Sequence, residues 1–328
     1  MPAVMVREGA KRGEWNDLTL ETIEIPALKK GEALVQIHAC SVNRADLLQR
    51  RGLYPPPPGA SKVPGLDFAG IVVTASQNSP YKENTRVFGI VSGGGYGRFA
   101  AVPANHLVPI PENLGYTEAA AAAEVFFTAY YNLLALAGTK ASDTVLLHGG
   151  GGGVGTAALQ LCSSIGAKVI TTAGSEEKVK RTLDMGAFAG INYKKEDFAA
   201  RVMDITRGEG VDVILDSIGA PYLPKHIEIL KTKGRLVIIG LMGGGAAEIN
   251  LVPLLSKRLK IIGSVLRTQS VKEKAAITRG FIKTVLPLLA SGRVKPVIDR
   301  IFPISRVEDA HRYLQKGEHF GKIVLTWE

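Results

Sequence analysis

Residues 144–161 read TVLLHGGGGGVGTAALQL, a short apolar run followed by five glycines and a second apolar pattern. Gly150, Gly152 and Gly155 satisfy the pattern G-x-G-x-x-G. The residues after the glycines have the three- and four-residue apolar spacing of one helix face, and Gly166 is a suitable end for that helix. The apolar positions are Val154, Ala157, Ala158, Leu161, Cys162 and Ile165. The glycines therefore lie at a strand-to-helix turn.

Such a turn predicts a site for the pyrophosphate of a dinucleotide. Glycine permits the tight turn, lets the backbone approach the phosphates and lets the helix pack closely on the strand. The N-terminus of the helix adds unpaired N–H groups and a partial positive charge. A merely flexible loop is the alternative, and the ordered patterns on both sides of the glycines argue against it.

The next strand indicates which dinucleotide is bound. NAD-binding folds place an acid about 20 residues further on, where it binds the ribose 2′-hydroxyl. Here the run VITTAGSEEKVKR has Gly174 and Ser175 at that place. Ser175 can hydrogen-bond to a 2′-phosphate, and Lys178 can neutralise it from one helical turn away. This favours NADPH, whereas Glu176 or Glu177 at the position of the acid would favour NADH.

The chain changes its pattern twice. Residues 1–120 alternate short β-type runs with proline and glycine turns, as in a barrel or sandwich. Residues 121–265 alternate apolar strands with helical patterns, which predicts a buried parallel sheet. Residues 266–328 contain a helical run, the β-type run PVIDRIFPI, the helical run VEDAHRYLQKG and the final run GKIVLTW. The predicted fold class is therefore α/β.

Composition limits the function classes. Lysine and arginine number 40 against 30 acidic residues, a net charge of +10 that favours anionic partners. The charges are scattered, so nucleic-acid binding stays open but is not favoured. The two cysteines exclude a disulfide scaffold and are typical of the cytoplasm. We expect no apolar run of the roughly 18 residues that a membrane span needs, and no secretory signal.

Several motifs occur together along the whole length: SVNRADLLQRRGLYPPPPGASKVPGLDFAGIV, FFTAY, GGGVG, TAGSEEK, INYKKEDF, LDSIG, GLMGGG, LLSKRLKIIGSVLR and GKIVL. In this order they resemble the zinc-free quinone oxidoreductase branch of the medium-chain dehydrogenase/reductase superfamily. The resemblance implies a Rossmann domain with a doubly wound parallel sheet over 121–265. It also implies a GroES-like, β-rich catalytic domain built from both chain ends, 1–120 and 266–328. NADPH, a quinone substrate and a homodimer paired through the cofactor domains are implied as well.

The resemblance also implies the site residues. Asn43 and Tyr54 are expected at the acceptor, as orienting residues and hydrogen-bond donors to its oxygen. For Tyr54, packing on the proline run or on the nicotinamide ribose is an equal alternative. The implied cofactor-binding residues are Asn43, Tyr54, Thr128, Gly152, Gly153, Val154, Gly155, Ser175, Lys178, Tyr193, Ser217, Ile218, Gly240, Leu241, Met242, Val265, Leu266, Arg267 and Lys322.

No catalytic metal is expected. The zinc-dependent relatives need a cysteine and a histidine where this chain has Asn43 and Leu66, and a lone Glu124 near the third place does not hold zinc. The six histidines are scattered and are interpreted as structural.

Hydride transfer from NADPH to a quinone needs orientation and a dry pocket more than acid catalysis. The same fold also suits an NADPH-dependent alkene or enoyl reductase, for which Tyr54 is the visible proton donor. A cofactor-binding protein with RNA-binding activity is the alternative outside the enzymes.

Overall fold

The computed structural model describes residues 1–7, 9–77 and 79–327. The chain divides into two compact units. One contains Met1–Phe127 and Leu266–Glu328, and the other contains Thr128–Val265.

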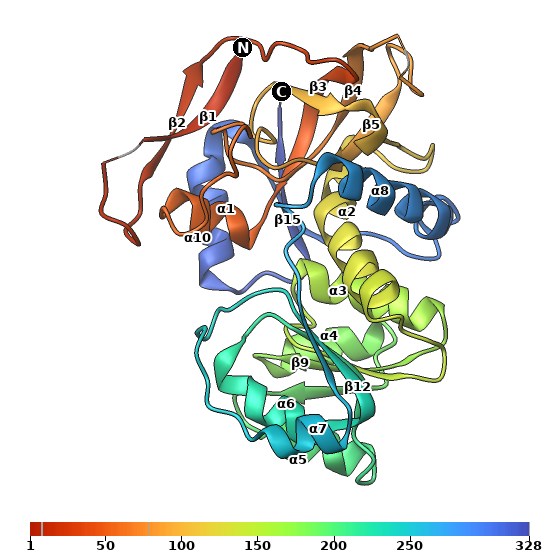
Figure 1. Cartoon of the computed structure of the whole chain (residues 1–328). Coiled ribbons are helices and arrows are strands. Elements are labelled where there is room, and N and C mark those ends of the chain that lie inside the picture. Colours follow the sequence, from red (N-terminus) through yellow and green to blue (C-terminus); the bar gives the residue numbers. More distant parts are fainter. Residues whose placement is uncertain (8, 78, 328) are drawn as a thin grey trace. The chain divides into compact units, whose positions relative to one another are not determined.

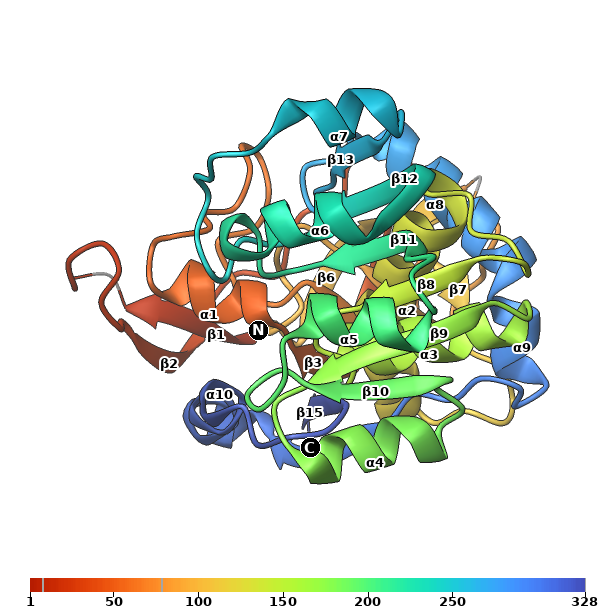
Figure 2. The same ribbon diagram turned by 90° about the horizontal axis from the view of Figure 1, so that it is seen from below.

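A six-stranded parallel sheet forms the centre of the unit Thr128–Val265 (Figure 1). Its strands are β8 (Thr144–Leu147), β9 (Lys168–Ala173), β10 (Ala189–Asn192), β11 (Val211–Asp216), β12 (Leu230–Ile238) and β13 (Lys260–Gly263). The order is β10-β9-β8-β11-β12-β13, with β13 at one edge (Figure 2). This is the order of a doubly wound dinucleotide-binding sheet, so the predicted fold class is confirmed.

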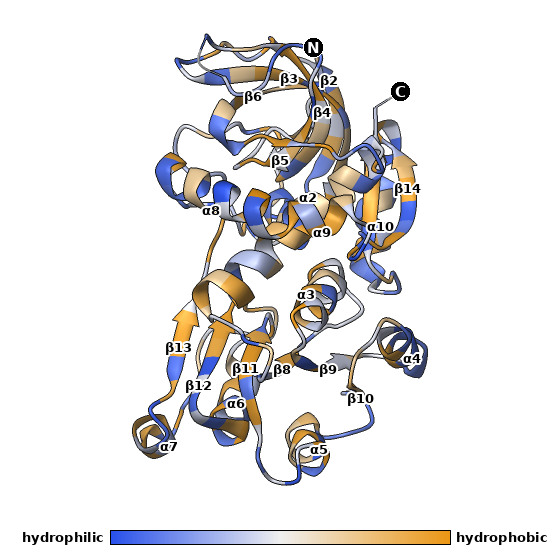
Figure 3. Ribbon diagram, turned by 90° about the vertical axis from the view of Figure 1, so that its right-hand side faces the viewer, coloured by the Kyte–Doolittle hydropathy of each residue, from blue (hydrophilic) through white to orange (hydrophobic). Residues whose placement is uncertain are grey.

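Helices cover both faces of this sheet. They are α3 (Gly153–Ser164), α4 (Glu176–Asp184), α5 (Phe198–Ile205), α6 (Leu223–Ile229) and α7 (Leu251–Ser256), with the 3-10 turn η3 (Ala220–Tyr222). The helix α3 lies on the opposite side of the sheet from α5 and α6 (Figure 3). Because both faces are covered, the central strands contain buried apolar runs, and Val145, Leu146 and Leu147 are fully buried. The helix predicted after the glycines is confirmed as α3.

The other unit contains a seven-stranded mixed sheet and the hairpin of β1 (Pro2–Arg7) and β2 (Asp17–Thr22). The sheet strands are β3 (Glu32–Val42), β4 (Asp67–Thr74), β5 (Arg86–Ile90), β6 (Phe99–Pro103), β7 (Val108–Pro109), β14 (Ile298–Pro303) and β15 (Lys322–Thr326). The C-terminal strand β15 pairs with β14 on one side and with β3 on the other. The prediction that this domain is built from both chain ends is therefore confirmed.

The helices of this unit are α1 (Arg44–Arg50), α2 (Tyr116–Ala129), α8 (Val271–Thr284), α9 (Leu286–Ala290) and α10 (Val307–Lys316), with the 3-10 turns η1 (Ala104–His106) and η4 (Ile304–Arg306). The last two residues of α2 belong to the other unit, and α2 continues there as the π-helix η2 (Tyr130–Leu136). A change to π geometry inside a helix is frequent at functional positions.

The expectation that no segment has the length and composition of a membrane span is wrong. Within the described residues, Tyr116–Leu136 is one such helix, with 21 residues and a mean hydropathy of 1.3. Its mean hydropathy is high because five fully buried alanines, residues 119–123, stand among other apolar residues. Since 67% of its most apolar 18-residue stretch is buried inside the protein, it has the character of a core helix.

Candidate functional site

The three glycines of the G-x-G-x-x-G pattern meet different surroundings. A Cβ on Gly150 would lie 2.7 Å from the Cβ of Thr171, and a Cβ on Gly155 would lie 2.3 Å from the oxygen of Gly149. A Cβ on Gly152 would find its nearest neighbour at 3.4 Å, an ordinary contact. The protein's own packing thus requires glycine at two of the positions. At Gly152 the missing side chain leaves room for something that approaches from outside.

The loop also offers hydrogen-bond donors. Gly152 is the N-cap of α3 and has no side chain to satisfy the first N–H groups of the helix. These groups, from Gly153 and Val154 onward, have no acceptor within the helix, and they stand at its positive end. Bare N–H groups beside an open glycine suit the pyrophosphate of a dinucleotide. The loop therefore fits the pyrophosphate of a nicotinamide dinucleotide.

The residues after β9 decide between a ribose hydroxyl and a phosphate. Ser175 is the N-cap of α4, and its Oγ accepts the N–H of Lys178 at 3.3 Å. The carboxylate of Glu176 accepts a hydrogen bond from Asn192 Nδ2 at 2.9 Å, and it lies 3.1 Å from Lys195 Nζ. The Asn192 bond, with the Lys195 contact, lowers the pKa of Glu176. This acid is therefore paired with its own neighbours.

Gly174 directly follows β9 and lies against Tyr193. A Cβ on Gly174 would be 2.8 Å from the hydroxyl oxygen of Tyr193, so an acidic side chain does not fit there without displacing the tyrosine. Tyr193 also borders a polar hollow of about 380 Å³. Its further lining residues are Lys194, Lys195, Glu196, Asp197, Phe198, Pro221, Tyr222 and Lys225. In the sequence, the motif NYKKEDF contains Lys194 and Lys195 and could have indicated that they lie at this hollow.

The turns after β11 and β12 are joined by hydrogen bonds. The carboxylate of Asp216 accepts the N–H groups of Ile218 and Gly219, both at 2.8 Å. The N–H of Met242 donates to the carbonyl of Ser217 at 3.1 Å. Asp216 thus holds the turn that contains two of the predicted cofactor residues, a role that the sequence reasoning missed.

Five further predicted cofactor residues lie in or beside these elements. A Cβ on Gly240 would meet the carbonyl of Ser217 at 3.1 Å, while Leu241 and Met242 expose more than half of their surface. Val265 is 45% exposed. Thr128 is buried near the end of α2, where its carbonyl accepts Asn132 Nδ2 at 2.8 Å.

Asn43 lies in the other unit and is fully engaged there. As the N-cap of α1 it donates its N–H to Asp46 at 2.8 Å. Its Nδ2 donates to Asp67 at 2.7 Å and to the carbonyl of Ser41 at 3.3 Å. Its Oδ1 accepts from Lys322 Nζ at 2.6 Å. Because both amide protons are used inside the protein, this geometry favours a positioning role for Asn43 over the donor role that the sequence suggested.

A buried charged network surrounds this asparagine. Burial raises the pKa of Asp46 to about 7, and it raises the pKa of Asp67 as well. Lys322 is buried and also donates to the carbonyl of Val42 at 3.1 Å. Leu66, next to Asp67, is a buried apolar residue without a metal-binding atom. The positions that hold the catalytic zinc in zinc-dependent relatives therefore do not fit a zinc ion here.

Tyr54 is held by Arg267. The guanidinium of Arg267 donates to the carbonyl of Tyr54 at 2.9 Å, and its central carbon lies 4.9 Å from the centre of the tyrosine ring. The same guanidinium donates to Gln49 Oε1 at 2.5 Å and to the carbonyl of Ser92 at 2.8 Å. Burial raises the pKa of Tyr54, so its hydroxyl keeps its proton at neutral pH. Arg267, predicted to bind the cofactor, thus orients Tyr54 through its side chain.

The predicted residues form two groups. Thr128, the glycine loop, Ser175, Lys178, Tyr193, the two turns and Val265 lie in the unit Thr128–Val265. Asn43, Tyr54, Leu266, Arg267 and Lys322 lie in the other. Within the second group the structure brings together two pairs, Asn43 with Lys322 and Tyr54 with Arg267.

Two family models match the chain. The alcohol dehydrogenase GroES-like domain matches residues 29–112, and the zinc-binding dehydrogenase domain matches residues 153–279. The quinone oxidoreductase of Rattus norvegicus is 33% identical over 306 residues, which cover 92% of this chain and 91% of that protein. The human quinone oxidoreductase is 32% identical over 310 residues with the same coverage.

Solved structures agree with this fold. The Escherichia coli quinone oxidoreductase in complex with NADPH superposes with a TM-score of 0.85 at 28% identity, over 99% of each chain. The CurK enoyl reductase superposes with a TM-score of 0.86 at 25% identity, over 100% of this chain and 99% of the other. The chain belongs to the medium-chain dehydrogenase/reductase superfamily, has quinone oxidoreductases among its relatives, and is an oxidoreductase of a family that uses a nicotinamide cofactor.

Proposed function

We propose that the protein is an NADPH-dependent quinone oxidoreductase that transfers a hydride to a quinone without a metal. The observation that carries the NADPH preference is the end of β9, where Ser175 and Lys178 stand and Glu176 is paired with Asn192 and Lys195. The E. coli relative is a quinone oxidoreductase in complex with NADPH. The buried, free thiols of Cys40 and Cys162 suit the cytoplasm, which we propose as its compartment.

The cofactor would lie along the carboxyl edge of the parallel sheet. Gly152, Gly153, Val154 and Gly155 would hold the pyrophosphate through their N–H groups. Ser175 and Lys178 would bind the 2′-phosphate, with Tyr193 beside the adenosine. When bound, the nicotinamide supplies the hydride, and the protein supplies orientation and the exclusion of water.

At the acceptor we assign the donor role to Tyr54. A phenol that stays protonated can donate a hydrogen bond to the quinone oxygen that gains negative charge. Arg267 would fix the ring through the carbonyl bond and the stacking contact, while Asn43, Lys322 and Asp67 would hold the neighbouring loop.

We expect Tyr54→Phe to lower quinone turnover about tenfold, because a neutral hydrogen bond contributes roughly 1 to 1.5 kcal/mol. The dissociation constant for NADPH should stay within about twofold, since the ring and its contact with Arg267 remain. Steady-state kinetics and fluorescence titration measure the two quantities. Tyr81→Phe, at another half-buried tyrosine of the same unit, is the control. Turnover equal to wild type in Tyr54→Phe would remove Tyr54 as the donor.

An alkene or enoyl reductase remains the second candidate, because the CurK enoyl reductase superposes as well as the quinone oxidoreductase does. Its reaction adds a proton to carbon and so depends more strongly on a donor such as Tyr54. NADPH oxidation with 1,2-naphthoquinone compared with an α,β-unsaturated ketone separates the two. A higher kcat/KM for the ketone would replace the quinone as the proposed acceptor.

We also propose a homodimer paired through the cofactor domains. In the described part of the chain, β13 ends the parallel sheet, which leaves one side of its backbone open to pairing with another strand. On the neighbouring helix α7, the exposed fractions of Leu251, Val252 and Leu255 are 61%, 68% and 81%. An edge strand beside an apolar helix suits a second copy of the same surface, related by a twofold axis.

We expect Leu255→Glu to weaken the dimer at least about 100-fold, because it places a charge in the apolar part of the interface. Sedimentation velocity over a concentration series measures this change. Leu183→Glu on α4, at another exposed leucine, should leave the dimer intact. A wild-type protein that is monomeric at tens of micromolar would contradict the proposal, as would a Leu255→Glu variant that dimerises normally.

A further inference from the structure

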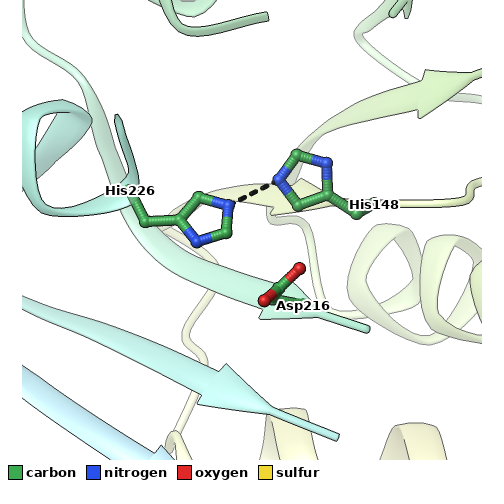
Figure 4. A group of neighbouring side chains, drawn as sticks. All are labelled: His148, Asp216 and His226. Carbon is green, nitrogen blue, oxygen red and sulfur yellow. Dashed lines mark hydrogen bonds between the residues drawn. The ribbon is translucent and has the colours of Figure 1, made fainter. Parts of the chain in front are cut away.

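Three buried side chains meet near the carboxyl edge of the parallel sheet (Figure 4). His148 follows β8, Asp216 ends β11, and His226 belongs to α6. The Nε2 atoms of the two histidines are 2.8 Å apart. One potential ligand atom from each residue lies within 4.8 Å of the other two. From the sequence, both histidines are interpreted as structural, and Asp216 has no predicted role.

Two polar groups of this cluster have fewer partners than they could bind. Among the described residues, Nδ1 of His226 is buried without a hydrogen-bond partner, so no contact prevents it from holding the ring proton and leaving Nε2 as a ligand atom. The carboxylate of Asp216 accepts only the two backbone N–H groups of its own turn, and none of the lysines and arginines described here forms an ion pair with it. A buried carboxylate without a cation is costly, and burial raises the pKa of Asp216 accordingly. A bound cation would remove this cost.

The donor set defines which cation fits. Two imidazoles and one carboxylate are typical ligands of zinc and its neighbours in the first transition series. Nε2 of His148 can coordinate when its proton resides on Nδ1, and that atom lies 3.1 Å from the hydroxyl oxygen of Thr172. Tetrahedral ligands about 2.05 Å from the ion stand roughly 3.3 Å apart. The two imidazoles therefore need to separate by only about half an ångström.

Two aromatic side chains pack against the cluster. The rings of Phe198 and Tyr222 lie 4.8 and 5.0 Å from the ring of His148, measured between centroids. Both residues line the polar hollow beside Tyr193. A rotation of Tyr222 would open the hollow toward His148 and His226.

We propose that one divalent transition-metal ion, such as Zn²⁺, binds per chain to His148, Asp216 and His226. The ion replaces the hydrogen bond between the imidazoles and connects the ends of β8 and β11 with α6. The glycine loop begins directly after His148, and Asp216 holds the turn at Ile218 and Gly219. The ion therefore restrains the two segments that carry the proposed cofactor contacts. The inference does not depend on which acceptor the enzyme reduces.

Calorimetric titration of the purified full-length protein with Zn²⁺ tests the site, together with absorption spectra of the Co²⁺-loaded protein. We expect one ion per chain and the visible bands of tetrahedral Co²⁺. At an ion concentration about 100 times the dissociation constant, the midpoint of thermal unfolding should rise by about 3 °C or more. Absence of saturable binding would overturn the proposal.

His226→Gln is the sharpest variant, because an amide can keep the hydrogen bond to His148 but is a poor zinc ligand. It should weaken Zn²⁺ binding at least about tenfold, and Asp216→Asn should do the same. His38→Asn, at a half-buried histidine stacked on Tyr116 in the other unit, should bind Zn²⁺ as the wild type does. Unchanged affinity in His226→Gln would overturn the proposal.

X-ray absorption of the zinc-loaded wild-type protein provides a test that needs no variant. Scattering from two imidazoles with oxygen ligands is the expected spectrum. Sulfur ligation, or scattering from a single imidazole, would place the ion elsewhere and overturn the assignment. Because this measurement uses the native chain, it decides the question even where a substituted cluster fails to fold.

Discussion

Replacing Ser175 with aspartate is expected to lower the affinity for NADPH at least 100-fold while the affinity for NADH stays the same or improves. Aspartate caps a helix as well as serine does, so α4 should keep its N-terminus. Its carboxylate would oppose the 2′-phosphate, and opposed like charges cost several kcal/mol. The same carboxylate can accept a hydrogen bond from the ribose hydroxyl of NADH. Fluorescence titration with both cofactors measures the change.

Ser175→Asn separates charge from capping, because asparagine is an equally good N-cap without charge. It should change the affinity for NADPH by less than about tenfold. Lys178→Ala should raise the KM for NADPH about 10- to 100-fold and leave that for NADH nearly unchanged, with Lys180→Ala, an exposed lysine on the same helix, as its control. If Ser175→Asp affected both cofactors equally, the 2′-phosphate would have to bind elsewhere.

Two glycines of the same loop should respond in opposite ways to alanine. Gly152→Ala places its Cβ no closer than 3.4 Å to the protein, so the midpoint of thermal unfolding should stay within about 2 °C of wild type. NADPH affinity should fall at least about tenfold, because the methyl group occupies the approach to the N–H groups of α3. Gly155→Ala drives a Cβ to 2.3 Å from the oxygen of Gly149 and should cost several kcal/mol of stability.

Each of these variants is the control for the other, since both add one methyl group to one loop. Differential scanning calorimetry without cofactor gives stability, and titration with NADPH gives affinity. A Gly152→Ala variant that binds NADPH like the wild type would mean that the pyrophosphate does not approach this glycine. A Gly155→Ala variant of normal stability would mean that helix and strand have room to separate.

The unit Thr128–Val265 was the part of the fold best predicted from the sequence, because the sequence patterns of its strands and helices are local. Short apolar runs such as residues 145–147 and 213–215 mark the central parallel strands, and the helix after the glycines shows its buried face through residues such as Ala158 and Leu161. The hairpin of β1 and β2 and the short helix α1 escaped prediction. Their stabilising contacts come from distant parts of the chain, for example from Glu308, which accepts the N–H of Leu18.

The contacts of the predicted site residues could not be read from the sequence. The motif VNRAD marks Asn43, but its partner Lys322 is 279 residues away in the chain, and no local pattern reports that contact. Arg267 likewise orients Tyr54 across 213 residues. The buried pair of His148 and His226 was invisible for the same reason, since the two side chains meet only when α6 packs on the sheet.

The position of β15 has a consequence for synthesis on the ribosome. This strand lies between β14 and β3, and its pairing with β3 joins residues more than 280 positions apart, such as Val42 and Ile323. The seven-stranded sheet therefore stays incomplete until β15 has been translated, while the segment that forms the parallel sheet has already emerged. A nascent chain should therefore contain a folded unit Thr128–Val265 while the seven-stranded sheet still has unpaired strand edges. A chaperone would shield these edges from other chains.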